Sequence, residues 1–99
     1  MKERKLRLND YGISEERYME LKYICLQYAH DRRSESIQKR ERAAAVEEAA
    51  KAADYALAPF IMRNVTERRR YEEMQVPSGI NQFFRARRRF FVELDRRVV

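Results

Sequence analysis

Residues 79–95 read GINQFFRARRRFFVELD, and this stretch decides the architecture of the chain. On a wheel of about 100° per residue, its apolar side chains gather on one side of a helix. They are Ile80, Phe83, Phe84, Phe90, Phe91 and Leu94. The opposite side is polar. Its residues are Asn81, Gln82, Arg85, Arg88 and Arg89, and Arg96, one residue beyond the stretch, lies on the same side. We therefore predict a long amphipathic helix with its aromatic face in the core and its basic face in solvent.

The segment before this helix predicts a partner helix and a turn. Thr66 can cap a short helix at about 67–75, and residues 76–79 (VPSG) then end it. Proline cannot continue a helix, glycine allows a tight turn, and Ser78 can cap the helix that follows. A short helix, a tight turn and a longer amphipathic helix form the helix-turn-helix layout, whose second helix enters the major groove of DNA. The inward residues of the short helix are Tyr71 and Met74.

The polar residues of the last helix are of the types that read DNA. Arginine can make two hydrogen bonds to guanine, and asparagine or glutamine can make two to adenine. We expect Asn81, Gln82 and Arg85 to contact bases, because base readout occurs at the N-terminal end of a recognition helix. The candidates for phosphate contacts are Arg68, Arg69, Arg70, Arg88, Arg89 and Arg96. The alternative is a solvated arginine face with no partner.

Two features of this helix have other interpretations. Arg87 lies on the aromatic side of the wheel, so we expect it to pair with Glu72 or Glu73 across the turn. The phenylalanines share one face, which favours a place in the core over a role in stacking on bases.

The N-terminal part begins with a basic arm at residues 1–12. Ser14 is placed to cap a helix, with Glu15 and Glu16 in its first turn, where negative charge suits the helix dipole. Apolar residues then recur at helical spacing up to about residue 30. The expected stripe is Tyr18, Leu21, Ile24, Cys25 and Tyr28, widened by Met19, Tyr23 and Leu26.

The middle of the chain is rich in alanine. A helix is predicted at about 36–53, capped by Ser34 or Ser36, because alanine is the best helix former. It either packs closely on another helix or projects into solvent, and we favour close packing. The alanines expected at that contact are Ala44, Ala45, Ala49, Ala52 and Ala53. Asp54 can cap a third helix that begins at 55–58, since Pro59 is tolerated only near a helix start. Its buried face is Phe60, Ile61 and Val65.

Composition agrees with an all-α domain of about five helices. The chain has 99 residues but only 2 glycines and 2 prolines, too few for the many turns of a sandwich or barrel. Residues 1–62 hold 12 basic and 11 acidic side chains, whereas residues 63–99 hold 10 and 5. We therefore distinguish an N-terminal helical part, 1–62, from a basic helix-turn-helix, 63–99. Basic charge gathered on one element suggests a polyanionic partner.

Several classes of protein are disfavoured. Cys25 is the only cysteine, so neither an internal disulfide nor a cysteine zinc site is expected. His30, the only histidine, is five positions further along, which places the two on different faces of a helix. No phosphate loop, metal-ligand spacing or nucleophile motif is present, and we expect no enzyme activity, metal or cofactor. The longest apolar run, residues 55–62, is too short to span a membrane, and we expect a cytoplasmic protein without membrane contact.

Two blocks of the sequence resemble a known family. The first block comprises YGISEERY at 11–18 and ELKYICLQY at 20–28. The second comprises NVT at 64–66, YE at 71–72, VPSG at 76–79, QFF at 82–84 and RRRFF at 87–91. Together they are similar to phage transcriptional regulators of the RinA/ArpU type. The C-terminal part of those proteins resembles region 4 of bacterial sigma factors, a helix-turn-helix that reads promoter DNA.

The resemblance implies sequence-specific binding of duplex DNA and regulation of phage late-gene transcription, with residues 80–89 in the DNA. The alternative is a phage-encoded interaction module that docks on host RNA polymerase or another nucleoprotein. Helix-turn-helix proteins often dimerise to read two half-sites, so a homodimer is compatible with the sequence, which does not require one.

Overall fold

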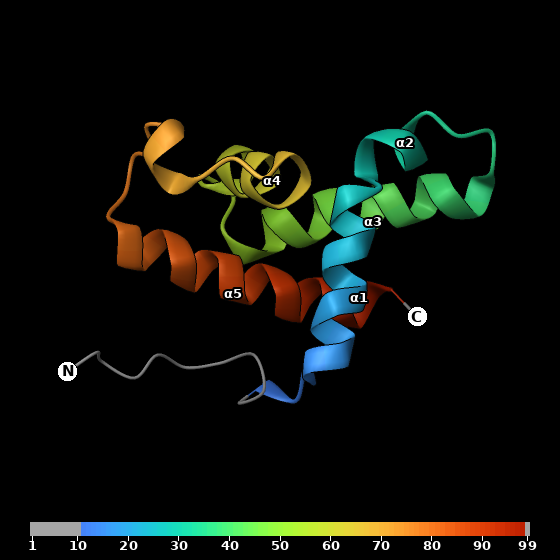
Figure 1. The fold of residues 1–99 in the computed structure, drawn as a ribbon, viewed down its shortest axis with the longest axis horizontal. Helices are drawn as coiled ribbons and strands as arrows, with labels where there is room; N and C mark the ends of the chain where they lie inside the picture. Colours follow the sequence, from blue (N-terminus) through green and yellow to red (C-terminus); the bar gives the residue numbers. More distant parts are fainter. Residues whose placement is uncertain (1–10, 99) are drawn as a thin grey trace.

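The computed structural model describes residues 11–98, and within them the protein is all-α. The chain forms α1 (Glu15–Leu26), α2 (Tyr28–Arg32), α3 (Ile37–Ala53), α4 (Ala58–Glu67) and α5 (Ile80–Arg97), with a 3-10 turn, η2 (Tyr71–Glu73), between α4 and α5 (Figure 1). The predicted fold class and helix number are confirmed. Most of the predicted basic arm, residues 1–10, lies outside the described residues. None of the described helices is long and apolar enough to cross a bilayer.

α1 begins where the sequence predicts. The hydroxyl of Ser14 accepts a hydrogen bond from the Arg17 amide at 3.0 Å, and two glutamates occupy the first turn. Leu21 and Cys25 are buried, as expected. The prediction that Met19, Tyr23 and Leu26 widen the buried stripe of α1 is wrong, because α1 contacts the rest of the protein through one face only. Three apolar residues on its other side stay exposed: Met19, Tyr23 and Leu26. The helix also ends earlier than predicted, and Gln27 separates it from the short α2.

α3 packs along α5, and the predicted close packing of the alanine-rich helix is confirmed (Figure 1). Ser36 caps it by accepting a hydrogen bond from the Lys39 amide. The buried residues of α3 are Ala43, Val46, Ala49, Ala50 and Ala53. Of the predicted alanines, Ala49 and Ala53 are buried there and Ala45 packs against the core, whereas Ala44 and Ala52 are exposed. The buried stripe is therefore turned relative to the predicted one and includes Ala43, Val46 and Ala50. Small side chains on this stripe let the two helix backbones approach closely.

α4 starts as predicted, but the helix expected after it is absent. Pro59 lies in the first turn of α4, as predicted, but the predicted cap is wrong: the N-cap is Leu57, and Asp54 accepts a hydrogen bond from the Leu57 amide at 3.1 Å in the turn before the helix. The predicted helix at 67–75 is wrong, because α4 continues to Glu67 and the next residue, its C-cap Arg68, has a left-handed backbone with φ 60°. Thr66 is inside α4 and donates its hydroxyl hydrogen to the Met62 carbonyl at 2.7 Å, so it caps nothing.

Only the 3-10 turn η2 stands in place of that short helix. The two residues predicted to face inward still do so: Met74 is buried and Tyr71 packs against the core. Gly79 rather than Ser78 is the N-cap of α5, and the Ser78 hydroxyl bonds the Gly79 carbonyl instead.

One hydrophobic core joins all these helices, including residues from both the 1–62 and the 63–99 part. Four residues of α5 form its centre and are essentially without exposure: Phe83, Phe90, Phe91 and Leu94. The ring of Tyr18 meets Phe91 edge-on at 5.0 Å, which ties α1 to α5. Ile80 was expected in this apolar face but is 47% exposed. It lies in the first turn of α5, which begins beyond the end of α3 (Figure 1).

Candidate nucleic-acid interface

The outward face of α5 holds the three side chains predicted to contact bases. Asn81, Gln82 and Arg85 are all exposed, and they follow one another along the first two turns. The buried phenylalanines on the opposite side fix the rotation of α5, so this polar face stays turned away from the core. Within residues 11–98, the side chain of Arg85 makes no hydrogen bond or ion pair, which leaves its guanidinium available for a ligand.

The other predicted arginines of this face differ in their availability. Arg88 is half-buried, and its guanidinium also makes no side-chain hydrogen bond to the described part of the chain. Arg89 is bound at the end of α3, where its Nε donates to the Ala53 carbonyl at 3.1 Å and its Nη2 lies 3.8 Å from Asp54. These contacts satisfy a helix C-terminus, so Arg89 supports the fold as well as adding charge.

The C-terminal end of the face is partly neutralised. Glu93 lies between Arg97 and Arg96, with carboxylate oxygens at 2.6 Å and 3.3 Å from their guanidiniums. The hydrogen bond from Arg97 is the main cause that lowers the pKa of Glu93, and this carboxylate therefore stays ionised. The most positive part of the face is thus its N-terminal half.

Arg68, Arg69 and Arg70 are not brought onto this face. They line a separate pocket of about 300 Å³ together with Lys22 and Arg87. Around α5, Arg87 points about 160° away from the centre of the polar face, at 100° per residue. The predicted contact residues therefore form two groups on nearly opposite sides of α5.

Arg87 is a residue whose role the sequence did not reveal. Its Nε donates to the side-chain oxygen of Asn64 at 2.6 Å, and its Nη1 donates to the Tyr18 hydroxyl at 3.4 Å. The guanidinium also lies over the Phe91 ring, 5.0 Å from its centroid. The predicted pairing with Glu72 or Glu73 is wrong, because Glu73 bonds Arg70 and Asn64 supplies the acceptor for Arg87. The only hint in the sequence was the position of Arg87 on the aromatic side of the wheel.

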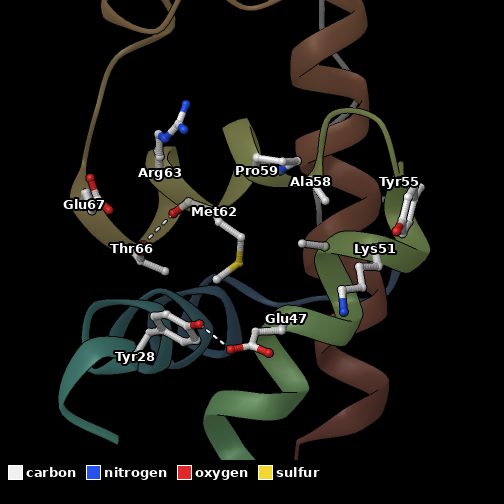
Figure 2. Close-up of a pocket in the computed structure, with 11 residues that line it drawn as sticks. Tyr28, Glu47, Lys51, Tyr55, Ala58, Pro59, Met62, Arg63, Thr66 and Glu67 are labelled. Atoms are coloured by element: carbon white, nitrogen blue, oxygen red, sulfur yellow. Dashed lines mark hydrogen bonds between the residues drawn. The ribbon is translucent and has the colours of Figure 1, made fainter. Parts of the chain in front are cut away.

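A further concavity, of about 480 Å³, lies between α2, α3 and α4 (Figure 2). Across it the Tyr28 hydroxyl donates to Glu47, and burial followed by this hydrogen bond raises the pKa of Tyr28 to about 12. Lys51 and Arg63 line the same space, as does a second carboxylate, Glu67. The mixed charge gives this pocket no preference for a polyanion.

Neither the thiol nor the imidazole belongs to a reactive pair. Cys25 is 1% exposed, and burial raises its pKa to about 12, so the sulfur is a neutral thiol near pH 7. His30 is exposed on α2. Activation of a cysteine requires a base within hydrogen-bond reach and a lowered pKa, and the pKa of Cys25 is shifted the opposite way.

Comparisons with models of protein families, with curated proteins and with solved structures gave no match to this chain. The resemblance to phage regulators therefore stays an expectation from the sequence motifs.

Proposed function

We propose that the protein binds duplex DNA in a sequence-specific way through the outward face of α5 and so regulates phage transcription. The observation that carries the proposal is the exposure of Asn81, Gln82 and Arg85 on a helix whose opposite face is buried. The transcriptional role rests on the sequence resemblance, and the binding mode rests on the chemistry of this face.

The dimensions of α5 suit a major groove. Its 18 residues make a rod about 27 Å long, and the groove of B-DNA is wide enough for one helix. In that position the N-terminal turns meet base edges, while Arg88 and Arg89 lie nearer to phosphates. The described chain offers no aromatic platform on this face, since the phenylalanines are in the core or packed against it. Readout of stacked duplex bases is therefore favoured over binding of unstacked single strands.

The proposal does not depend on a tight helix-turn-helix. That motif joins its helices by about three or four residues, whereas residues 68–79 separate α4 from α5 here. We therefore propose α5 as a recognition helix that α3 and α4 support from behind, with a longer connection than the motif has.

Selection from a random duplex library, followed by fluorescence anisotropy at several salt concentrations, tests the proposal. The affinity must fall steeply as salt rises, because each neutralised phosphate releases counterions. Arg33→Ala is a matched control that removes one exposed charge from the loop after α2. Failure to enrich any sequence, together with no binding at about 50 mM salt, where phosphate contacts are strongest, contradicts the proposal.

One observation favours a second candidate, a module that docks on another protein such as host RNA polymerase. Met19 and Tyr23 are 59% and 58% exposed, and with Leu26 they form an apolar stripe on the outer side of α1. Binding of purified polymerase that survives nuclease treatment and is lost in Met19→Glu/Tyr23→Glu would support this candidate. Binding unaffected by that double substitution would contradict it. The same variant should bind DNA as the unmodified chain does.

A further inference from the structure

The pocket beside Arg87 is lined by more cations than have acidic partners in the fold. Five of its nine lining residues are cationic, and no carboxylate lines it: the cations are Lys22, Arg68, Arg69, Arg70 and Arg87. Two of the five have acidic partners outside the pocket, because Arg69 lies 3.1 Å from Glu67 and Arg70 lies 3.5 Å from Glu73. Lys22, Arg68 and Arg87 have no such partner within residues 11–98, so a net positive charge faces the cavity.

Hydrogen bonds of Asn64 fix two walls of the cavity. Asn64 accepts from Arg87 Nε and donates its amide to the Arg69 carbonyl at 2.8 Å, so one side chain fixes both α5 and the loop after α4. Within residues 11–98, Arg87 makes hydrogen bonds through Nε and Nη1, which leaves Nη2 for a ligand. Arg68 is the left-handed C-cap that ends α4, and the turn that it starts places Arg69 and Arg70 on the same wall of the pocket.

We propose that this pocket binds a phosphate group. Guanidinium groups match phosphate oxygens through paired, charge-assisted hydrogen bonds, and an ammonium such as Lys22 adds a point charge. The volume of about 300 Å³ is at the lower end for small-molecule sites, which suits a phosphate with a small substituent. Leu26, Val65 and Phe91 form the remaining, apolar part of the wall and can accommodate that substituent.

This site is independent of the proposed readout face. Arg87 and the α5 polar face point in nearly opposite directions, so one stretch of groove cannot reach both. The phosphate therefore comes either from the backbone of a second DNA segment or from a free phosphorylated small molecule. Both sources present the same group to the same cations.

Titration of the ¹⁵N-labelled full chain with inorganic phosphate, against sodium chloride at equal ionic strength, tests the inference. We expect saturable shifts of the amides of Asn64 and residues 68–70. The double variant Lys22→Ala/Arg68→Gly removes two cations, and glycine accepts the left-handed backbone at 68 without strain. Its phosphate affinity should fall about tenfold or more, the amount expected from losing charge-assisted hydrogen bonds. The matched control Arg33→Ala/Lys51→Ala loses the same charge outside the pocket and should bind as the unmodified chain does.

Drift of these amides without saturation, equal in phosphate and chloride, overturns the inference, and so does unchanged affinity in the pocket variant. Two further titrations identify the source of the phosphate. If it is DNA, a short duplex shifts the same amides and inorganic phosphate competes with it. If it is a free ester, adenosine monophosphate binds more tightly than phosphate and leaves the affinity for the duplex unchanged. Arg85→Ala should leave the phosphate titration untouched, so a failure of the readout face is distinguishable from a failure of the pocket.

Discussion

Replacement of Arg85 by alanine separates recognition from folding. Arg85 is exposed, and its guanidinium makes no hydrogen bond or ion pair within residues 11–98, so its loss should change the free energy of unfolding by less than about 0.5 kcal/mol. A bidentate contact to guanine contributes about 1–3 kcal/mol of discrimination, which is about 5-fold to 150-fold in affinity. The whole effect should therefore appear in binding to the selected duplex, with little effect on unrelated sequences.

The salt dependence of the same measurement distinguishes base contacts from phosphate contacts. Arg88→Ala should weaken every duplex alike and lower the slope of log affinity against log salt by about 0.9, the value for one phosphate. Arg85→Ala should leave that slope unchanged. Arg89→Ala should additionally destabilise the fold by about 1 kcal/mol, because the hydrogen bond to the Ala53 carbonyl is lost. Anisotropy across a salt series and urea unfolding measure these quantities. Equal losses on specific and unrelated duplexes for Arg85→Ala would refute the assignment of that residue to base readout.

Three further predictions concern the framework behind the interface. Asn64→Ala should lower the free energy of unfolding by about 1–3 kcal/mol, because the Nε of the half-buried Arg87 loses its acceptor and the Arg69 carbonyl loses its donor; urea unfolding measures this, and an unchanged midpoint would contradict the role of Asn64. The raised pKa of Cys25, about 12 against an ordinary 9.0, means that only the unfolded chain ionises this thiol as pH rises above 9. Stability should therefore fall between pH 9 and 12, with Cys25→Ala showing a smaller fall, and an equal fall in both chains would contradict the assignment. Ala49→Leu should cost about 1–3 kcal/mol or more, because Ala49 is fully buried in the core and a larger side chain has no room there, while Ala52→Leu on the exposed side should be neutral; equal effects in thermal melts would refute the close packing.

The parts of the fold that follow from local pattern were predictable from the sequence. The two faces of α5 follow from helical periodicity over a long segment, and the caps at Ser14 and Ser36 follow from side-chain chemistry at helix starts. The direction in which α3 packs was not predictable, because a helix with alanine on most sides has no unique apolar face.

The rest of the site depends on contacts between distant parts of the chain. Thr66 has the chemistry of a cap, yet a threonine inside a helix can bond the carbonyl four residues earlier, and the sequence does not distinguish the two. Arg68 has a left-handed backbone although it is not a glycine, so the sequence does not indicate this conformation. The acceptor of Arg87 is 23 residues away, so the basic pocket became visible only in the folded chain.

Mapping of amide shifts on the ¹⁵N-labelled chain with a selected duplex tests the central claim most directly. The account predicts that the largest changes fall at Asn81, Gln82 and Arg85, and that those at Asn81 and Gln82 become smaller for Arg85→Ala at an unchanged DNA concentration. Changes confined to the apolar stripe of α1, or a first half of α5 that stays unperturbed while the duplex binds, would contradict it.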